Sequence, residues 1–249
     1  FDWLQPVHLY DATRVGGKQI VVRMARAGEK LTLLDGSDLA LTASDMVIAD
    51  DKKPLCLAGV MGGTASGIEA TTTSLFFEAA TFDAGFVRRT AQRHKTRTDS
   101  SMRFEKTLDQ NQPIEIIERF LYLLDQAGIH ADYAHEIISV GGDAPATVIE
   151  VSHEFLEKRA GVSFAEGQIE SLLKPLGFTV LKSFDKEQKA VYAITVPSFR
   201  ASKDIKIKED ILEEVVRCYG FEKVPLTLPL LTPTPFDFTP VSRTQKIKY

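Results

Sequence analysis

One carboxylate stands inside an apolar segment, where burial would change its acid-base behaviour. Glu78 lies in residues 75–82, LFFEAATF. Burying an ionised carboxylate is costly, so such a group is paired, protonated or held in a polar pocket. Because perturbed carboxylates gather at functional sites, Glu78 is a candidate site residue. The alternation of a strand is equally consistent with a Glu78 side chain that points to solvent.

Two further features in the first half of the chain could carry chemistry. His8, in the segment QPVH, has an ordinary pKa of about 6.5 that suits proton transfer at neutral pH, although a plain surface or core histidine would look the same. Gly59, Gly62 and Gly63 would let the backbone approach a ligand closely. No Gly-Lys-Ser/Thr follows them, so they are not a P-loop, and a simple hairpin turn is the alternative.

A basic segment follows at residues 88–106, with seven Lys or Arg and two acidic residues in a chain of net charge −4. This local excess is typical of a phosphate-binding patch. The arginines that we expect to contact RNA are Arg88, Arg89, Arg93 and Arg97. A solvated helix face is the alternative interpretation.

An acidic cluster near the C-terminal end could bind a metal. Oxygen ligands suit hard cations such as Mg²⁺, which uses one or two carboxylates together with water. Three neighbouring lysines and the N-terminus of a helix could instead neutralise the cluster. The four candidates are Asp204, Asp210, Glu213 and Glu214.

The elements that must position these residues indicate an α+β protein. Short β-rich runs separated by glycine turns predict a curved, mainly antiparallel sheet, with strands near residues 20–23, 46–49 and 74–77. Asp83 precedes a helical pattern as an N-cap, and residues 113–126 predict a second helix that packs on the sheet. A smaller α/β unit of winged-helix type follows, with strands near 148–151, 178–181 and 190–196 and helices near 153–159, 165–176 and 207–219.

Composition limits the class of protein. The 249 residues are 44% hydrophobic and 26% charged, which is enough for two cores. The pI of about 5.8 argues against a protein that binds nucleic acid over its whole surface. No run approaches the ~18 apolar residues of a membrane span, so we expect a cytoplasmic protein without a membrane partner. Cys56 and Cys218 lack metal-ligand spacing and are expected to be buried thiols.

The chain divides into three parts at changes of composition. We expect a first domain over residues 1–143, ending in a polar Gly-rich stretch, and a small α/β module over 147–224. Residues 225–249 contain five of the eleven prolines, which excludes a regular helix and predicts a linker to a further domain. The absence of Met at position 1 indicates a piece of a longer protein.

Taken together, these segments closely resemble the β subunit of bacterial-type phenylalanyl-tRNA synthetase, and the resemblance covers nearly the whole chain. It implies that the first domain is an editing domain, N-terminally truncated, that hydrolyses mischarged Tyr-tRNA(Phe). Lys95-Thr96 replaces the family's usual Gly-Leu. The matching motifs, in order, are QPVHLYD (5–11), LDG (34–36), AGVMGG (58–63), RRTA (88–91), RTDSS (97–101), RFE (103–105), PSFR (197–200) and EDILEE (209–214).

The resemblance also implies roles for individual residues. Glu78 would recognise the tyrosine hydroxyl, and His8 would help position water or the terminal ribose. Thr98 would complete the catalytic set. Pro6, Ala58 and Gly59 would line the substrate pocket together with Glu78.

The implied partners and cofactors belong to a larger assembly. The resemblance implies an α2β2 heterotetramer that makes Phe-tRNA with ATP, which is bound by the α subunit rather than by this chain. Mg²⁺ would be held by the acidic cluster together with the α subunit. The alternative is a non-catalytic RNA-binding and subunit-assembly module of the same β subunit.

Overall fold

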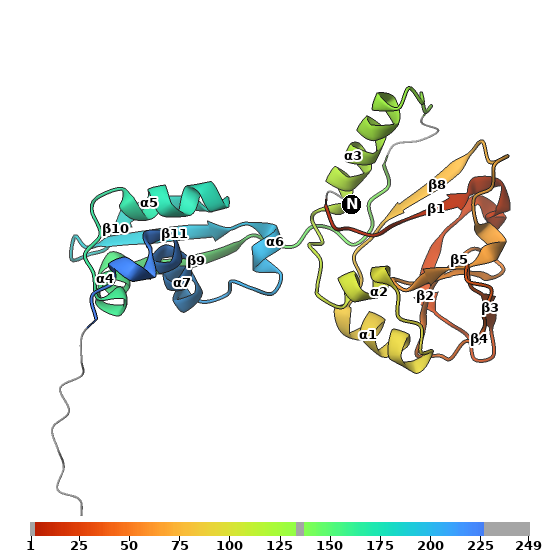
Figure 1. Cartoon of the computed structure of the whole chain (residues 1–249), viewed down its shortest axis with the longest axis horizontal. Coiled ribbons are helices and arrows are strands. Elements are labelled where there is room, and N and C mark those ends of the chain that lie inside the picture. The colour runs from red at the N-terminus through yellow and green to blue at the C-terminus, as the bar shows by residue number, and fades with distance from the viewer. Residues whose placement is uncertain (1–2, 133–136, 227–249) are drawn as a thin grey trace, which may run out of the picture.

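The structure is a computed structural model that describes residues 3–132 and 137–226. Its helices and strands form two units with separate hydrophobic cores (Figure 1). The first unit runs from strand β1 to helix α3, and its core lies between Tyr10 and Phe104 in the sequence. The second unit begins at strand β9, and its core lies between Ile149 and Val216.

The strands of the first unit pair antiparallel in three separate sheets. One sheet has the order β2-β5-β6-β7, β1 pairs with β8, and β3 pairs with β4. The single curved sheet expected from the sequence is therefore wrong, although strands β2, β5 and β8 lie where strands were predicted. The bounds are β1 (Val7–Asp11), β2 (Val21–Met24), β3 (Lys30–Thr32), β4 (Asp38–Ala40), β5 (Met46–Ala49), β6 (Pro54–Leu57), β7 (Met61–Gly62) and β8 (Leu75–Ala79).

The helices of the first unit cover its core from different sides. Helix α1 (Ala84–Arg93) begins at the predicted cap, because the Asp83 carboxylate accepts a hydrogen bond from the Phe86 amide. Helix α2 (Asp99–Phe104) follows and packs against α1. Helix α3 (Pro113–Gln126) has the predicted bounds, starts with proline, and lies against β8 away from α1 and α2 (Figure 1).

The second unit is a three-stranded antiparallel sheet, in the order β10-β11-β9, with helices packed against it. The predicted order of strands and helices is confirmed, but α5 is shorter than expected because Pro175 and Gly177 turn its end into a 3-10 helix. The bounds are β9 (Thr147–Ser152), α4 (His153–Ala160), α5 (Gln168–Leu173), β10 (Thr179–Phe184), β11 (Ala190–Val196), α6 (Ser198–Ala201) and α7 (Lys208–Tyr219). Short 3-10 helices lie at Ala12–Arg14, Gly16–Lys18, Thr64–Ser66, Lys174–Leu176 and Phe221–Lys223.

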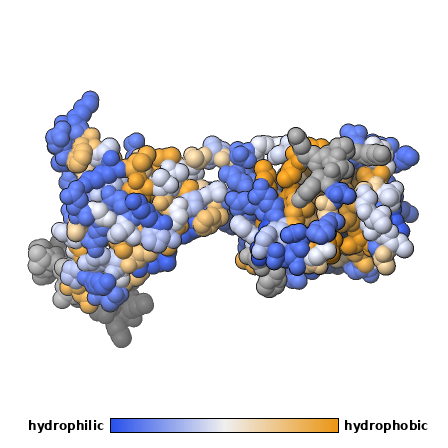
Figure 2. All heavy atoms as spheres, turned by 90° about the horizontal axis from the view of Figure 1, so that it is seen from above, coloured by the Kyte–Doolittle hydropathy of each residue, from blue (hydrophilic) through white to orange (hydrophobic). Residues whose placement is uncertain are grey.

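The two units meet over a narrow connection (Figure 2). The Ser198 hydroxyl of α6 donates to the Asp109 carboxylate at 2.6 Å, and the Ala144 amide donates to the Asn111 side chain at 2.7 Å. Within the described ranges, no helix is both long and apolar enough to cross a membrane. Most of the predicted linker, residues 227–249, lies outside the described residues.

The two cysteines differ in their surroundings. Both are free thiols, but only Cys56 is buried as predicted. Cys218 is partly exposed, so the expectation of burial was wrong for that residue. It lies in the last turn of α7, a helix whose buried positions are those of Ile211, Glu214, Val215 and Val216.

The turn that follows β6 provides a test of packing. Gly59 has φ +70°, and a Cβ there would lie 2.8 Å from Val87 Cγ2. Gly28 has φ +82° but no atom within 4 Å of such a Cβ. We expect Gly28→Ala to cost about 1 kcal/mol through its backbone alone, and Gly59→Ala to cost about 1–3 kcal/mol more through overpacking. Chemical denaturation of both variants measures the difference, and equal losses would contradict this packing.

Candidate active site

The candidate site lies on one face of the ribbon formed by β1 and β8. The antiparallel register places His8 directly opposite Glu78, and Tyr10 opposite Phe76. Because side chains alternate along a strand, these four residues share a face. The other face carries Phe77, whose ring lies 4.5 Å from that of Phe120 in α3. Helix α3 therefore covers the back of the ribbon and leaves the face with His8 and Glu78 turned toward the rest of the unit.

Glu78 is held by a hydroxyl from the neighbouring strand. The Tyr10 hydroxyl donates to Glu78 Oε2 at 2.5 Å, within the range of a short charge-assisted bond. Burial raises the pKa of Glu78 to about 7, against the lowering effect of the Tyr10 hydrogen bond. Burial likewise raises the pKa of Tyr10, so this phenol stays protonated. Glu78 therefore titrates near neutral pH beside a fixed donor.

The β6–β7 hairpin forms the floor under this face. Cys56 and Gly62 are paired across the hairpin, and a Cβ on Gly62 would lie 2.2 Å from the Cε1 atom of His8. Only glycine lets the hairpin backbone approach the imidazole this closely. His8 Nε2 is buried without a hydrogen-bond partner among the described residues, and burial lowers the pKa of His8. The ring is consequently neutral at neutral pH, with an unused nitrogen.

The glycine turn at residues 59–63 forms hydrogen bonds with the start of α2, at Thr98 and Ser100. Thr98 caps α2 and donates to the Val60 carbonyl at 2.7 Å, while the Ser100 hydroxyl donates to the Gly59 carbonyl at 3.1 Å. Ala58 is buried in the core. These contacts fix the end of β6 against α2.

Pro6 directly precedes β1 and is partly buried. The adjacent Gln5 side chain donates to the Ala80 carbonyl at 2.7 Å. This bond extends the pairing of β1 and β8 beyond the last residues of the two strands. Pro6 therefore lies at the same end of the ribbon as His8 and Glu78.

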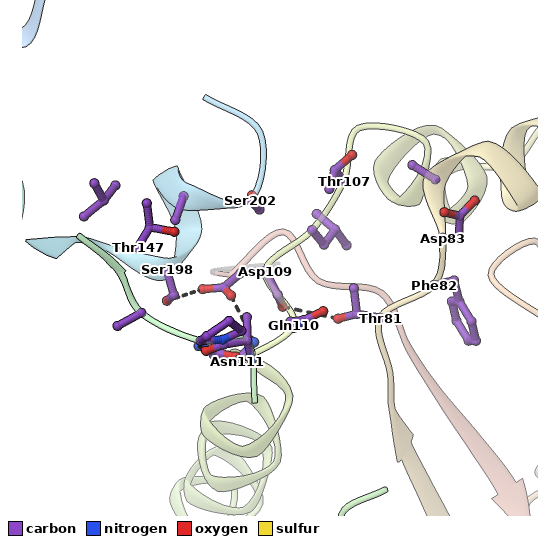
Figure 3. A pocket seen from close by; sticks show the side chains of 17 residues that line it. Thr81, Phe82, Asp83, Thr107, Asp109, Gln110, Asn111, Thr147, Ser198 and Ser202 are labelled. Carbon is purple, nitrogen blue, oxygen red and sulfur yellow. Dashed lines mark hydrogen bonds between the residues drawn. The ribbon is translucent and has the colours of Figure 1, made fainter. Parts of the chain in front are cut away.

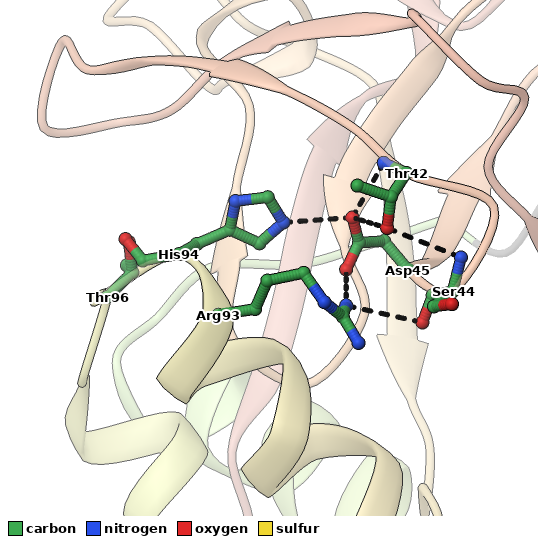
Figure 4. A network of polar contacts seen from close by, with 6 residues as sticks. All are labelled: Thr42, Ser44, Asp45, Arg93, His94 and Thr96. Carbon is green, nitrogen blue, oxygen red and sulfur yellow. Dashed lines mark hydrogen bonds and ion pairs between the residues drawn. The ribbon is translucent and has the colours of Figure 1, made fainter.

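One arginine of the predicted basic patch, Arg93, is engaged by a buried carboxylate (Figure 4). Arg93 forms an ion pair with Asp45, and His94 Nε2 lies 2.9 Å from the other oxygen of the same carboxylate. The Asp45 side chain is completely buried. Although burial alone would raise the pKa of Asp45, hydrogen bonds from Thr42 and His94 hold it below its usual value. Arg93 thus anchors the end of α1 on the core.

The other predicted RNA contacts lie at the surface. Arg88 and Arg89 are exposed on α1, with the Arg89 guanidinium 4.9 Å from the Phe86 ring centre. Arg97 is exposed and pairs with Glu105 at 3.3 Å. Of the four arginines, Arg88 and Arg89 therefore form the more open pair.

Three of the four carboxylates in the acidic cluster already have protein partners. Glu214 is buried between Arg200 at 2.8 Å and Arg217 at 2.5 Å, and these bonds hold its pKa low against the effect of burial. Arg200 also pairs with Asp204, and the Asp210 carboxylate caps its own helix through the Ile207 amide.

Glu213 of the cluster points to solvent. Across residues 3–132 and 137–226, no three His, Cys, Asp or Glu side chains come together as a metal site. In this chain, the four carboxylates do not fit a bound Mg²⁺.

A cavity of about 710 Å³ lies between the two units (Figure 3), and Glu78 is not among the residues that line it. Hydroxyl, amide and carboxylate groups line it, among them Thr81, Asp109, Asn111 and Ser198. Sequence patterns did not indicate this cavity, because its walls come from segments far apart in the chain. Tyr10, by contrast, had a usable signal, since it lies two residues after His8 and shares its face in any strand.

Comparisons with known proteins give the following similarities. A family model described as the B3/4 domain matches residues 1–128, and one described as the tRNA synthetase B5 domain matches residues 149–221. The phenylalanine–tRNA ligase β subunit of Staphylococcus haemolyticus (strain JCSC1435) is 36% identical over 227 residues, and that of Staphylococcus aureus (strain bovine RF122 / ET3-1) is 37% identical. Each match covers 91% of this chain and 27% of the relative, so the chain spans about a quarter of their length.

One solved structure also matches. It is an N-terminal fragment of the phenylalanyl-tRNA synthetase β-subunit from Pyrococcus horikoshii, with 16% identity and a TM-score of 0.46. The match covers 86% of this chain and 59% of that one.

The Asp45 network predicts a pH-dependent contribution to stability. We expect Asp45→Asn to lower the free energy of unfolding by about 2–3 kcal/mol at pH 7, because charge-assisted bonds to Arg93 and His94 are removed. Since the folded pKa of Asp45 is depressed, the difference is full above the unfolded pKa of about 4 and disappears as pH falls through the folded value. Urea denaturation between pH 2.5 and 7 measures it. The exposed Asp38→Asn is the control, and a difference independent of pH would contradict the prediction.

Proposed function

Because the chain belongs to the B3/4 domain family, which its residues 1–128 match, we propose that its first unit hydrolyses the ester bond of a mischarged aminoacyl-tRNA. The substrate in this proposal is Tyr-tRNA(Phe), since the curated relatives are β subunits of phenylalanine–tRNA ligase. The observation that carries the proposal is the half-buried Glu78 carboxylate, which faces His8 across two strands and titrates near pH 7.

Glu78 suits the recognition of a hydroxyl group. Tyrosine and phenylalanine differ only in the phenol oxygen, and an ionised carboxylate is a strong acceptor for that O–H. A phenylalanyl ester would leave the half-buried carboxylate without this partner, which disfavours its binding. The site would therefore remove tyrosine and spare the correct product.

His8 is proposed to position the attacking water or the terminal ribose. Its neutral ring has a buried Nε2 without a hydrogen-bond partner among the described residues, and in the tautomer that carries the proton on Nδ1 this nitrogen would accept a hydrogen bond from either group. Thr98 stays a predicted member of the catalytic set, with its hydroxyl engaged by the Val60 carbonyl. Pro6, Ala58 and Gly59 stay predicted pocket residues that support the same hairpin and ribbon.

The wider context is also proposed. We propose that the longer protein is a ligase β subunit that works with an α subunit in an α2β2 heterotetramer, where the α subunit binds ATP. The divisions 1–143, 147–224 and 225–249 and the winged-helix likeness of the second unit remain predictions. A Mg²⁺ site at the acidic cluster would require Asp204 and Glu214 to exchange their arginine partners for the metal, because both carboxylates are paired here.

The role of Glu78 predicts a specific loss of activity. We expect Glu78→Gln to slow deacylation of Tyr-tRNA(Phe) about tenfold to hundredfold, because an amide oxygen is a weaker acceptor than a carboxylate. The release of labelled tyrosine over time measures the rate. Glu150→Gln, an exposed change on β9, is the control and should match the parent.

Two other outcomes distinguish the alternatives. Equal rates for Glu78→Gln and the parent would show that the pocket is assigned wrongly. Release no faster than spontaneous hydrolysis in the parent itself would favour the alternative, a non-catalytic RNA-binding and assembly module.

The exposed arginines of α1 predict a change in salt dependence. We expect Arg88→Ala/Arg89→Ala to weaken binding of tRNA(Phe) and to reduce the slope of log K against log salt by about 0.7–0.9 for each phosphate that the variant no longer neutralises. Binding measured between 50 and 300 mM KCl gives the slope. Arg159→Ala is the matched control, because Arg159 also lies over a phenylalanine ring, that of Phe155 in the second unit. An unchanged slope would remove α1 from the RNA interface.

A further inference from the structure

Tyr10 holds the carboxylate on which the proposed selectivity depends. In the strand register Tyr10 pairs with Phe76 rather than with Glu78, so its hydroxyl reaches the carboxylate along the diagonal of the two strands. The bond engages Oε2, and a carboxylate has about four lone-pair positions for donors. A second hydroxyl can therefore approach Glu78 while Tyr10 stays in place.

The Tyr10 ring is fixed rather than mobile. The residue is fully buried in the core of the first unit. Its ring packs edge-on against His8, with centroids 4.4 Å apart, and against Phe76 at 6.4 Å. This packing holds the hydroxyl of Tyr10 beside Oε2 of Glu78.

We propose that Tyr10 is a positioning residue that keeps Glu78 ionised and aimed at the hydroxyl of the substrate. This inference rests on the proposed editing function. Tyr10 has one proton to give, and its short bond to Oε2 favours the charged acceptor over the neutral acid. Without that bond, burial alone would act on Glu78, and the neutral acid would prevail to a higher pH.

Of the groups that face Glu78, Tyr10 is the one that favours its ionised form over its neutral form. His8 faces it from β1 and is neutral at neutral pH, because burial lowers its pKa. Cys56 faces it from β6, and burial raises the pKa of this thiol, so it too is neutral. Helix α3 packs on the opposite face of β8 through Phe120. Among these groups, Tyr10 supplies the hydrogen bond that lowers the pKa of Glu78.

The test is Tyr10→Phe in the whole chain, which keeps the ring and removes the hydroxyl. We expect the midpoint of the pH–rate profile for deacylation of Tyr-tRNA(Phe) to move upward by about one pH unit from its parent value near 7. At pH 6 the variant should be about tenfold slower than the parent, and at pH 9 the two rates should converge. Tyr192→Phe is the matched control, because Tyr192 is also buried and its hydroxyl bonds His153 at 2.9 Å.

A second measurement separates this inference from the proposed function. Carbon-13 NMR of carboxyl-labelled glutamate follows the titration of Glu78 directly, with its signal assigned by its disappearance in Glu78→Gln. We expect Glu78 to titrate about one pH unit higher in Tyr10→Phe than in the parent. An unchanged titration overturns the role of Tyr10 even if the parent is active. If the parent hydrolyses nothing, a shifted titration supports Tyr10 while the editing function fails.

Discussion

The pairing of β1 with β8 is the interaction on which the candidate site depends. These strands lie about seventy residues apart in the chain, and their register alone sets His8 against Glu78. Because side chains alternate on a strand, a slip of β8 by one residue would turn Glu78 toward α3 and set Phe77 beside His8 and Tyr10 instead. A two-stranded ribbon is marginal by itself in water, so the register must be enforced from outside the ribbon.

Four sets of contacts enforce it. At one end the Gln5 side chain bonds the Ala80 carbonyl, and at the other the Asp11 carboxylate accepts hydrogen bonds from Thr13 and Thr72. On the back, Phe77 packs on α3, and on the front Gly62 admits the His8 ring against the hairpin. Apolar packing and hydrogen bonds thus stabilise the same register of β1 and β8. The position of Glu78 depends on this register rather than on the sequence around Glu78.

Local patterns predicted the elements better than their assembly. The N-cap at Asp83, the bounds of α3 and strand β11 follow from short-range chemistry that one sequence displays. The division of the first unit into three sheets depends on pairings between distant segments, which no local pattern encodes. Glu78 and His8 were singled out from residue type, and the structure pairs them across β1 and β8. The ion pair of Arg93 was hidden, because its partner Asp45 lies 48 residues away. Counting charges along the chain therefore overstated the free basic surface.

The burial of Glu78 has a thermodynamic consequence for any ligand of this face. A carboxylate with a pKa of about 7 is only partly ionised in neutral buffer, so a ligand that selects one protonation state must drive protons to or from solution as it binds. The heat of association then includes the ionisation heat of the buffer, and the apparent affinity changes with pH even for an uncharged ligand. The burial that raises the pKa of Glu78 therefore makes binding at this face a proton-exchange reaction.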